Sequence, residues 1–276
     1  MKKKTLVFTD LDGTLLDHYT YQTVDAEETI AILTFHNIPI IPNSSKTFPE
    51  IMLIRQQLHL DTPFIIENGA AIYIPLNHFI ERPQNVTFEQ DFWVKSFCQK
   101  KDHWIALLEK HATSFREYYQ GFSEMDIAKI AELTGLSLEN AAMAKQRQYG
   151  EPVNWLGNEV QKQAFIELMQ SLGANVLQGG RFLHISGHCD KGKAQHWLAQ
   201  EYQLQMPTQE VKTIALGDGQ NDAAMLEQAS IAIQIKSPVH DFPELKRKEG
   251  IVQSSQYGPA GWAECLQETL ALNLKH

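Results

Sequence analysis

Two aspartates, Asp10 and Asp12, stand at the end of a short apolar run over residues 4–9, and Gly13 follows them. Aspartate and glycine favour turns, so an ordinary strand-to-turn boundary explains this cluster as long as it is taken alone. A calcium loop is excluded because Gly13 comes too early and Tyr21 stands where that loop needs a glutamate. Paired carboxylates after a strand are, however, suited to acid–base and nucleophilic chemistry.

Three further polar clusters follow or open expected elements later in the chain. They are Ser44-Ser45-Lys46, Lys191-Gly192 and the run from Gly217 to Asp222. Taken alone, Ser44 is explained as a helix cap and Lys191 as a solvated lysine. Ligands of open parallel sheets bind beyond the carboxyl ends of the strands. We therefore expect the four clusters to meet at one site.

The four clusters hold the carboxylates of Asp10, Asp12, Asp218 and Asp222, and three carboxylates that converge beyond a sheet repel one another. A hard, oxygen-seeking divalent cation relieves that repulsion, and Mg²⁺ fits. A cation beside a carboxylate, a lysine and a hydroxyl group is suited to phosphoryl transfer. The chain has no phosphate-binding loop of the Gly-x-x-x-x-Gly-Lys-Ser/Thr type, and no Gly-x-Gly-x-x-Gly after its first strand. P-loop and dinucleotide enzymes are thereby disfavoured.

Strands and helices alternate at both ends of the chain. The expected elements of the first part are strands over 4–9, 38–42 and 64–66, with helices over 25–36 and from about 45 to 58. Those of the last part are helices over 191–203 and 221–228, with strands over 213–216 and 231–235. Such alternation predicts an α/β fold, a doubly wound parallel sheet with helices on both faces.

The middle of the chain breaks this pattern. Residues 75–92 read as a linker with two prolines. After it we expect helices over 93–111, 123–134 (capped by Ser123), 137–145 (capped by Ser137) and 158–171, then an apolar stretch over 182–185. The sequence thus predicts a core domain made of residues 1–84 and 187–276, interrupted by an inserted α+β domain over residues 85–186.

Composition and charge limit the kinds of partner that we expect the chain to bind. The chain has 276 residues and a formal net charge of −9, which disfavours nucleic-acid binding. It has no apolar run of the roughly 20 residues that a membrane helix needs, so no membrane partner is expected. The three cysteines, Cys98, Cys189 and Cys265, are too widely spaced for a zinc site or a disulfide framework. We expect reduced thiols in a cytoplasmic protein.

The four clusters together resemble the signature of the haloacid dehalogenase-like (HAD) phosphatases. Asp10-Leu-Asp12-Gly13-Thr14 is similar to the first motif, Ser44 to the second and Lys191 to the third. The run Gly217-Asp218-Gly-Gln-Asn221-Asp222 is similar to the fourth. The order of the motifs and the strands between them match, and the insertion resembles the C2 type of cap domain. The resemblance implies a Rossmann-like core and Mg²⁺ as cofactor.

A narrower resemblance is to the mannosyl-3-phosphoglycerate phosphatases. It rests on segments in both the core and the insertion, namely 44–47, 67–69, 133–137, 147–151, 179–184 and 190–192. It implies a cytoplasmic hydrolase of a small phosphorylated sugar, with mannosylglycerate and phosphate as products. A glucosyl-3-phosphoglycerate phosphatase, another sugar phosphatase, a phosphohexomutase of the same fold and a non-catalytic sugar-phosphate sensor remain alternatives. The oligomeric state is open.

The superfamily resemblance implies roles for the core residues. Asp10 is the expected nucleophile that forms an aspartyl-phosphate, and Asp12 the expected acid and then base. Ser44 and Lys191 are expected to hold the phosphoryl oxygens. The expected metal ligands are Asp10, the Asp12 carbonyl and Asp218, with Asp222 as a more distant or water-mediated partner.

The narrower resemblance implies a substrate with a carboxylate as well as a phosphate. Arg181 is the best candidate to bind that carboxylate, because arginine recognises carboxylates bidentately. His184 and Arg147 follow, although a core histidine and a salt-bridged helix end explain them equally well. The full set expected at the substrate site is Gly13, Ser45, Lys46, Asn68, Arg147, Glu151, Arg181, His184 and Asn221.

Overall fold

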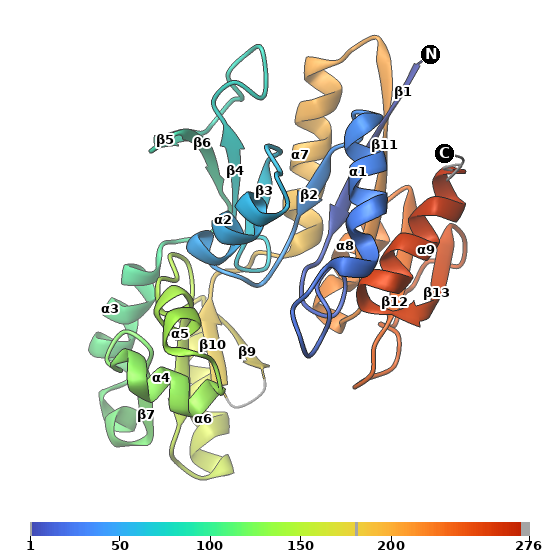
Figure 1. Cartoon of the computed structure of the whole chain (residues 1–276). Helices are drawn as coiled ribbons and strands as arrows, with labels where there is room; N and C mark the ends of the chain where they lie inside the picture. The colour runs from blue at the N-terminus through green and yellow to red at the C-terminus, as the bar shows by residue number, and fades with distance from the viewer. Residues whose placement is uncertain (1, 180–181, 272–276) are drawn as a thin grey trace. The chain divides into compact units, whose positions relative to one another are not determined.

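The computed structural model describes residues 2–179 and 182–271 (Figure 1). The chain divides into two compact units, each made of separate stretches of sequence. The first unit comprises Met1–Ser45, His59–Lys95 and Asp190–His276, and the second comprises Lys46–Leu58 and Ser96–Cys189.

A parallel sheet forms the centre of the first unit. Its strands are β1 (Lys2–Thr9), β2 (Ile40–Pro42), β11 (Gln209–Gly217), β12 (Ile231–Lys236) and β13 (Ile251–Tyr257). Within the described residues they lie in the order β13-β12-β11-β1-β2, and every pair is parallel. The strands other than β13 carry apolar, fully buried residues such as Phe8, Ile41 and Leu216, which is typical of a sheet covered on both faces.

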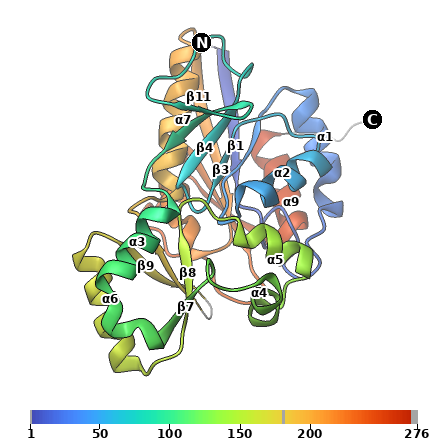
Figure 2. The same ribbon diagram turned by 90° about the vertical axis from the view of Figure 1, so that its left-hand side faces the viewer.

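Helices cover both faces of this sheet, as the alternating pattern predicts. They are α1 (Glu27–Phe35), α7 (Lys191–Gln205), α8 (Ala223–Gln228) and α9 (Gly258–Leu270), with the short 3-10 turns η1 (Val24–Ala26) and η3 (Gln220–Asp222). Helices α7 and α8 contact each other and β11, whereas α9 contacts β12, β13 and α1. Figure 2 shows α7 on one side of the strands and α1 with α9 on the other. The expected doubly wound α/β core is confirmed.

A second, antiparallel sheet in the first unit was not predicted. It consists of β3 (Phe64–Ile66), β4 (Ala71–Pro75), β5 (Thr87–Glu89) and β6 (Phe92–Ser96), in the order β3-β4-β6-β5. The predictions of a linker over 75–92 and of a helix from residue 93 were wrong here. In β6, Phe92 and Val94 are buried, whereas Trp93 and Lys95 are more exposed. This alternation has the period of a strand, and ring contacts of Phe92 with Phe64 and Tyr73 reinforce it.

The second unit combines helices with an antiparallel sheet. Its helices are α2 (Phe48–Gln57), α3 (Lys101–His111), α4 (Ile127–Thr134), α5 (Leu138–Lys145) and α6 (Glu159–Ser171), with the 3-10 turn η2 (Thr113–Tyr118). Its strands are β7 (Tyr119–Gly121), β8 (Glu151–Trp155), β9 (Asn175–Gly179) and β10 (Phe182–Ser186), in the order β7-β8-β10-β9. This sheet and its helices make the α+β architecture that we expected of the insertion.

Each face of the second unit's sheet has its own apolar cluster. Val153, Leu183 and Ile185 pack with residues of α3 and α6, such as Trp104 and Phe165. On the opposite face, Phe182 packs with α4 and α5 and with the loop that follows β7. Opposite faces follow from the two-residue period of a strand, in which neighbouring side chains alternate.

The boundaries between the two units differ from the predicted domain boundaries. The chain passes between the units at residues 45/46, 58/59, 95/96 and 189/190, so that α2 groups with the second unit. One reason is local packing, because Thr47 Oγ1, at the start of α2, donates to the carbonyl of Met143 in α5 over 3.1 Å. Helix α5 begins after Ser137 as predicted. Helix α4 begins only at Ile127, because Asp126 caps it in place of Ser123.

Candidate active site

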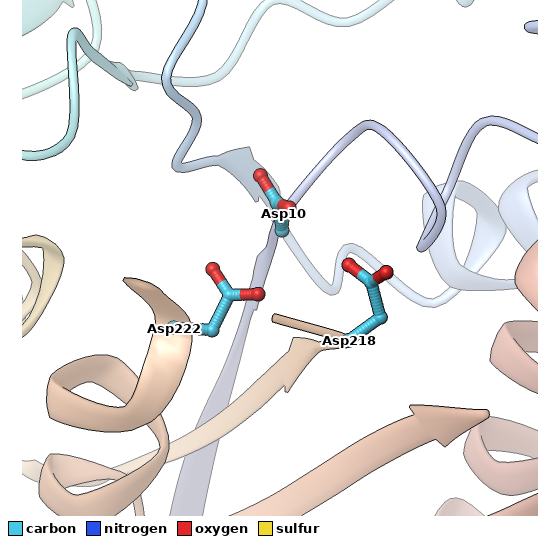
Figure 3. A group of neighbouring side chains, drawn as sticks. All are labelled: Asp10, Asp218 and Asp222. Carbon is cyan, nitrogen blue, oxygen red and sulfur yellow. The ribbon is translucent and has the colours of Figure 1, made fainter. Parts of the chain in front are cut away.

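Three aspartates from separate parts of the sequence meet beyond the strands of the parallel sheet. Asp10 follows β1, Asp218 follows β11, and Asp222 ends η3. All three are buried, and one carboxylate oxygen of each lies within 4.8 Å of the others. Figure 3 shows the three carboxylates turned toward a common space. The fold therefore brings together the carboxylates that the sequence singles out.

The register of two strands explains this meeting. Thr9 of β1 is paired with Leu216 of β11, and the amide of Asp10 donates to the Leu216 carbonyl over 2.9 Å. Both strands thus end at the same level. Gly13 has a φ of +73°, and a β-carbon there would lie 2.6 Å from Asp218 Oδ2. A glycine is required for the first loop to pack this closely against the Asp218 carboxylate.

Lys191 connects two of the three carboxylates. Its Nζ lies 2.7 Å from Asp10 Oδ1 and 2.6 Å from Asp222 Oδ1, and its side chain is 0% exposed. Lys191 is the first residue of α7, and its carbonyl accepts a hydrogen bond from Asn43 Nδ2 over 3.0 Å. The other oxygen of Asp222, Oδ2, accepts from the amide of Gly219 over 3.0 Å. Asp222 is therefore engaged through both of its oxygens.

The cluster holds three carboxyl groups and the single ammonium group of Lys191, so the acids outnumber their counter-ion. Burial, together with the charge of Asp10, raises the pKa of Asp222, and Lys191 only partly offsets this. The same two causes raise the pKa of Asp218. Burial alone lowers the pKa of Lys191, but Asp10 and Asp222 outweigh it and raise that pKa. Lys191 is thus held as an ammonium ion among competing carboxylates.

Asp218 has further partners that the sequence did not reveal. Thr14 Oγ1 donates to Asp218 Oδ1 over 3.3 Å, and His240 Nε2 lies 3.3 Å from Asp218 Oδ2. The side chain of Ser237 is also hydrogen bonded to Asp218. Ser237 and His240 follow β12, the next strand of the parallel sheet. Their position after a strand end is the signal that could have found them.

A second contact that the sequence did not reveal fixes the main chain of Asp10. The indole Nε1 of Trp262 donates to Thr9 Oγ1 over 3.0 Å, and Thr9 Oγ1 donates to the Asp10 carbonyl over 2.6 Å. Trp262 belongs to α9, and both side chains are fully buried. These contacts fix the end of β1 from which the Asp10 carboxylate projects.

Hydrogen bonds connect three other predicted core residues, Ser44, Asn68 and Asn221. Ser44 is buried two residues beyond the end of β2, and its amide donates to the Ile65 carbonyl over 3.1 Å. The Ser44 carbonyl accepts from the amide of Asn68 over 2.9 Å. Asn68 Oδ1 in turn accepts from Asn221 Nδ2 over 3.4 Å. Ser45 is half-buried beside Ser44.

Asp12 is half-buried in the loop that follows Asp10. Its carboxylate is not a member of the acidic cluster of Asp10, Asp218 and Asp222. The expected contribution of Asp12 to metal binding is its main-chain carbonyl, which leaves the carboxylate for proton transfer.

The remaining predicted substrate residues belong to the second unit. Arg147 is half-buried. The burial of His184 is the first cause that lowers the pKa of His184 to about 4, and the positive charge of Arg147 is the second. Lys46 Nζ lies 3.9 Å from Glu50 Oε1 within the same unit. Arg181 lies outside the described residues.

Glu151 and His184 lie on opposite faces of the second unit's sheet. Strand β8 pairs antiparallel with β10, with Glu151 opposite Ile185 and Pro152 opposite His184. Paired residues share a face, so Glu151 shares the face of Ile185 and His184 shares that of Phe182. Glu151 Oε1 accepts hydrogen bonds from Ser123, over 2.8 Å from its amide and 2.7 Å from its hydroxyl. The structure therefore does not bring these two predicted substrate residues together.

Comparison with known proteins decides the family. Residues 7–240 match the family model of the haloacid dehalogenase-like hydrolases. The chain belongs to this family. It is 35% identical, over 98% of both chains, to a glucosyl-3-phosphoglycerate/mannosyl-3-phosphoglycerate phosphatase of Methanococcoides burtonii. It is 31% identical, over 96% of this chain and 97% of the relative, to a protein of the same name in Persephonella marina.

Solved structures agree with the haloacid dehalogenase-like fold. A crystal structure from Thermoplasma acidophilum matches 98% of this chain and 100% of its own, with a TM-score of 0.66 and 14% identity. The expected family, fold class and enzyme class, a phosphoric monoester hydrolase, are thus confirmed. No helix among residues 2–179 and 182–271 combines the length and the apolar character that membrane crossing requires.

The donor set of this haloacid dehalogenase-like site fits a hard divalent cation. Asp10 and Asp218 offer carboxylate oxygens, the ligands that Mg²⁺ prefers. Burial and the charge of Asp10 raise the pKa of Asp218 and of Asp222 and so disfavour their charged forms, and a bound cation would relieve the repulsion. Asp222 is a poorer ligand, since Lys191 and the amide of Gly219 already engage both of its oxygens.

Proposed function

We propose that the protein is an Mg²⁺-dependent phosphatase of glycosyl-3-phosphoglycerates, with mannosyl-3-phosphoglycerate as the main substrate and glucosyl-3-phosphoglycerate as the alternative. The observation that carries the phosphatase chemistry is the buried contact of Lys191 with Asp10, beside Asp218. The substrate class is supported by the names of two relatives that match this chain over nearly its whole length.

Asp10 is the proposed nucleophile. One of its oxygens attacks phosphorus, so that a phosphorus–oxygen bond to Asp10 forms while the bond to the leaving alcohol breaks. Lys191 fixes the other oxygen of the carboxylate at 2.7 Å, and its charge compensates the negative charge that accumulates on the phosphoryl group. Asp222 holds the Lys191 ammonium in place, and Ser44 binds a phosphoryl oxygen.

Asp12 is the proposed acid and base. Its carboxyl group gives a proton to the leaving alcohol oxygen in the first step. It then takes a proton from the water that cleaves the phosphate from Asp10, which restores both aspartates. Mg²⁺, held by Asp10, Asp218 and the Asp12 carbonyl, would neutralise charge on the phosphoryl oxygens when it is bound.

Recognition of the glycosyl-glycerate part is assigned to residues of the second unit. Arg147 and Arg181 are the proposed partners of the glycerate carboxylate. His184 shares the environment of Arg147 and is assigned to the sugar. Glu151 lies on the other sheet face, bound to Ser123, and we now assign it a positioning role for the loop at Ser123.

The test compares substrates that do and do not carry the carboxylate. Phosphate release is measured from the mannosyl and glucosyl esters and from p-nitrophenyl phosphate, which lacks both sugar and carboxylate. Arg147→Ala should raise KM for the glycosyl esters about tenfold or more while p-nitrophenyl phosphate is hydrolysed as before. Arg116→Ala is the matched control, because Arg116 is an exposed arginine of the same unit paired with Glu124. Equal KM changes for all three esters would contradict the assignment of Arg147.

A further inference from the structure

Two cysteines that are 91 positions apart in sequence meet in the second unit. The Sγ atoms of Cys98 and Cys189 lie 3.6 Å from each other. Both side chains are half-buried, and Cys98 lines a surface pocket of about 440 Å³ together with His188 and Trp104. Small molecules in solution can therefore reach the Cys98 thiol through this pocket.

The close approach is built into the main chain. A β-carbon on Gly187 would lie 2.3 Å from Cβ of Cys98, so only a glycine lets the two segments pack directly. Two residues further on, the amide of Cys189 donates to the Gly187 carbonyl over 2.9 Å. The Cys189 Sγ lies 3.6 Å from the same carbonyl oxygen. This tight turn holds the Cys189 thiol on the side of Cys98.

We propose that Cys98 and Cys189 form an oxidisable dithiol that becomes an intramolecular disulfide under hydrogen peroxide. A disulfide has sulfurs about 2.05 Å apart, so the two thiols must approach by about 1.5 Å. Rotation of the two side chains supplies a movement of this size. The proposal goes beyond phosphate ester hydrolysis and rests on the packing of the second unit alone.

The reaction consumes one peroxide for each disulfide. The thiolate of one cysteine attacks a peroxide oxygen, the O–O bond breaks, and a sulfenic acid and water result. The second thiolate attacks the sulfenic sulfur, the S–S bond forms, and a second water leaves. The two sulfurs lose two electrons in total and the peroxide gains them. A thiol reductant reverses the reaction by exchange.

The position of the pair gives the modification a structural consequence. The chain enters the longer segment of the second unit after Lys95 and leaves it after Cys189. A disulfide between Cys98 and Cys189 would thus join the two segments next to these crossings. Cys189 also precedes Asp190, the cap residue of α7 from which Lys191 projects. The bond would restrain the segment that leads into the catalytic lysine.

The test identifies the linked peptides by mass spectrometry after proteolysis without reductant. Folded wild-type protein is treated with hydrogen peroxide, and we expect one dominant cross-linked pair, Cys98 with Cys189, that disappears on reduction. The same treatment in concentrated urea should give a mixture of the pairings open to the chain's three cysteines. Such a difference between folded and urea-treated protein would show that the fold, and not the intrinsic reactivity of the thiols, selects the Cys98–Cys189 pair.

Variants complete the test. Cys265→Ser should leave the cross-link unchanged, because Cys265 is buried in α9 and burial raises the pKa of its thiol to about 12. Cys98→Ser and Cys98→Ala should both abolish the cross-link and leave Cys189 as a sulfenic acid or a mixed adduct. Absence of the 98–189 peptide from oxidised, folded wild type would overturn the proposal. So would a pairing mixture equal to that found in urea.

Discussion

Lys191 Nζ lies 2.6 Å from Oδ1 of Asp222, and both side chains are 0% exposed. A fully buried pair of this kind contributes little net stability, but removal of one partner leaves an uncompensated buried charge. Lys191 also neutralises Asp10. Its loss therefore affects the stability of the core and the charge of the nucleophile together.

We expect Lys191→Met to lower the free energy of unfolding by about 3–5 kcal/mol in the absence of a divalent cation. The double variant with Asp222→Asn should recover part of this loss, because one of the repelling acids is gone. Urea unfolding of wild type, the two single variants and the double variant completes a double-mutant cycle. Strictly additive losses would show that the two groups are not coupled. Phosphate release should fall about 10²–10³-fold in Lys191→Met, as for other transition-state donors.

Mg²⁺ should stabilise the wild-type protein. Binding to the folded state alone adds about 2.7 kcal/mol at a concentration of 100 times Kd, and the melting temperature rises accordingly. Asp218→Asn removes a carboxylate of the acidic cluster and should abolish this rise. Asp25→Asn is the control, since Asp25 is an exposed aspartate of the same unit. An Mg²⁺-dependent rise that survives in Asp218→Asn would place the ion elsewhere.

The Thr9 hydroxyl links Trp262 to the main chain of Asp10 through two hydrogen bonds. Thr9→Val removes the hydroxyl, leaves the indole of Trp262 without its acceptor and costs about 1–3 kcal/mol for the buried donor. We expect kcat to fall severalfold with little change in KM, because the nucleophile is displaced rather than the substrate contacts. Thr9→Ser keeps the hydroxyl and should restore kcat. Equal kcat values for the valine and serine variants would assign Thr9 a packing role only.

His184 makes the stability of the second unit pH-dependent. Burial first, and the charge of Arg147 second, lower the pKa of His184 from 6.5 to about 4. The unfolded chain therefore binds this proton more readily than the folded one. The stability contribution is complete above pH 6.5 and is lost as the pH falls toward 4, by up to about 3 kcal/mol.

His184→Asn should flatten the decline of unfolding free energy between pH 6.5 and pH 4 by this amount. Urea unfolding at intervals across that range measures it. His103→Asn, which changes an exposed histidine of α3 in the same unit, should leave the slope as in wild type. A slope that is unchanged in His184→Asn would mean that His184 is protonated in the folded state.

The core of the site could be predicted because its residues follow strand ends. Asp10, Lys191 and Asp218 each stand directly after or at the start of a regular element, and the topology of a parallel sheet brings such positions together. His240 lies four residues beyond β12 in a loop without a recognisable pattern. The contact of Trp262 with Thr9 joins positions 253 residues apart, and no spacing rule connects them.

The middle of the chain was harder to predict for a physical reason. Short strands such as β5 and β6 offer only three to five residues of alternation, which a helical period can also accommodate. The opposite placement of Glu151 and His184 depends on the register of β8 with β10. A shift of one residue would reverse it, and the sequence does not specify the register. The contact between Cys98 and Cys189 depends on the same kind of tertiary detail.

The most direct test of the proposed chemistry is phosphate release by Asp10→Asn. The substitution keeps the size of the side chain and removes the nucleophilic charge. With Mg²⁺ and mannosyl-3-phosphoglycerate, wild type and the Asp25→Asn control should release phosphate at similar rates. Asp10→Asn should release none above background, because the covalent route through Asp10 is closed. Phosphate release by pure Asp10→Asn at a rate near that of wild type would contradict Asp10 as the nucleophile.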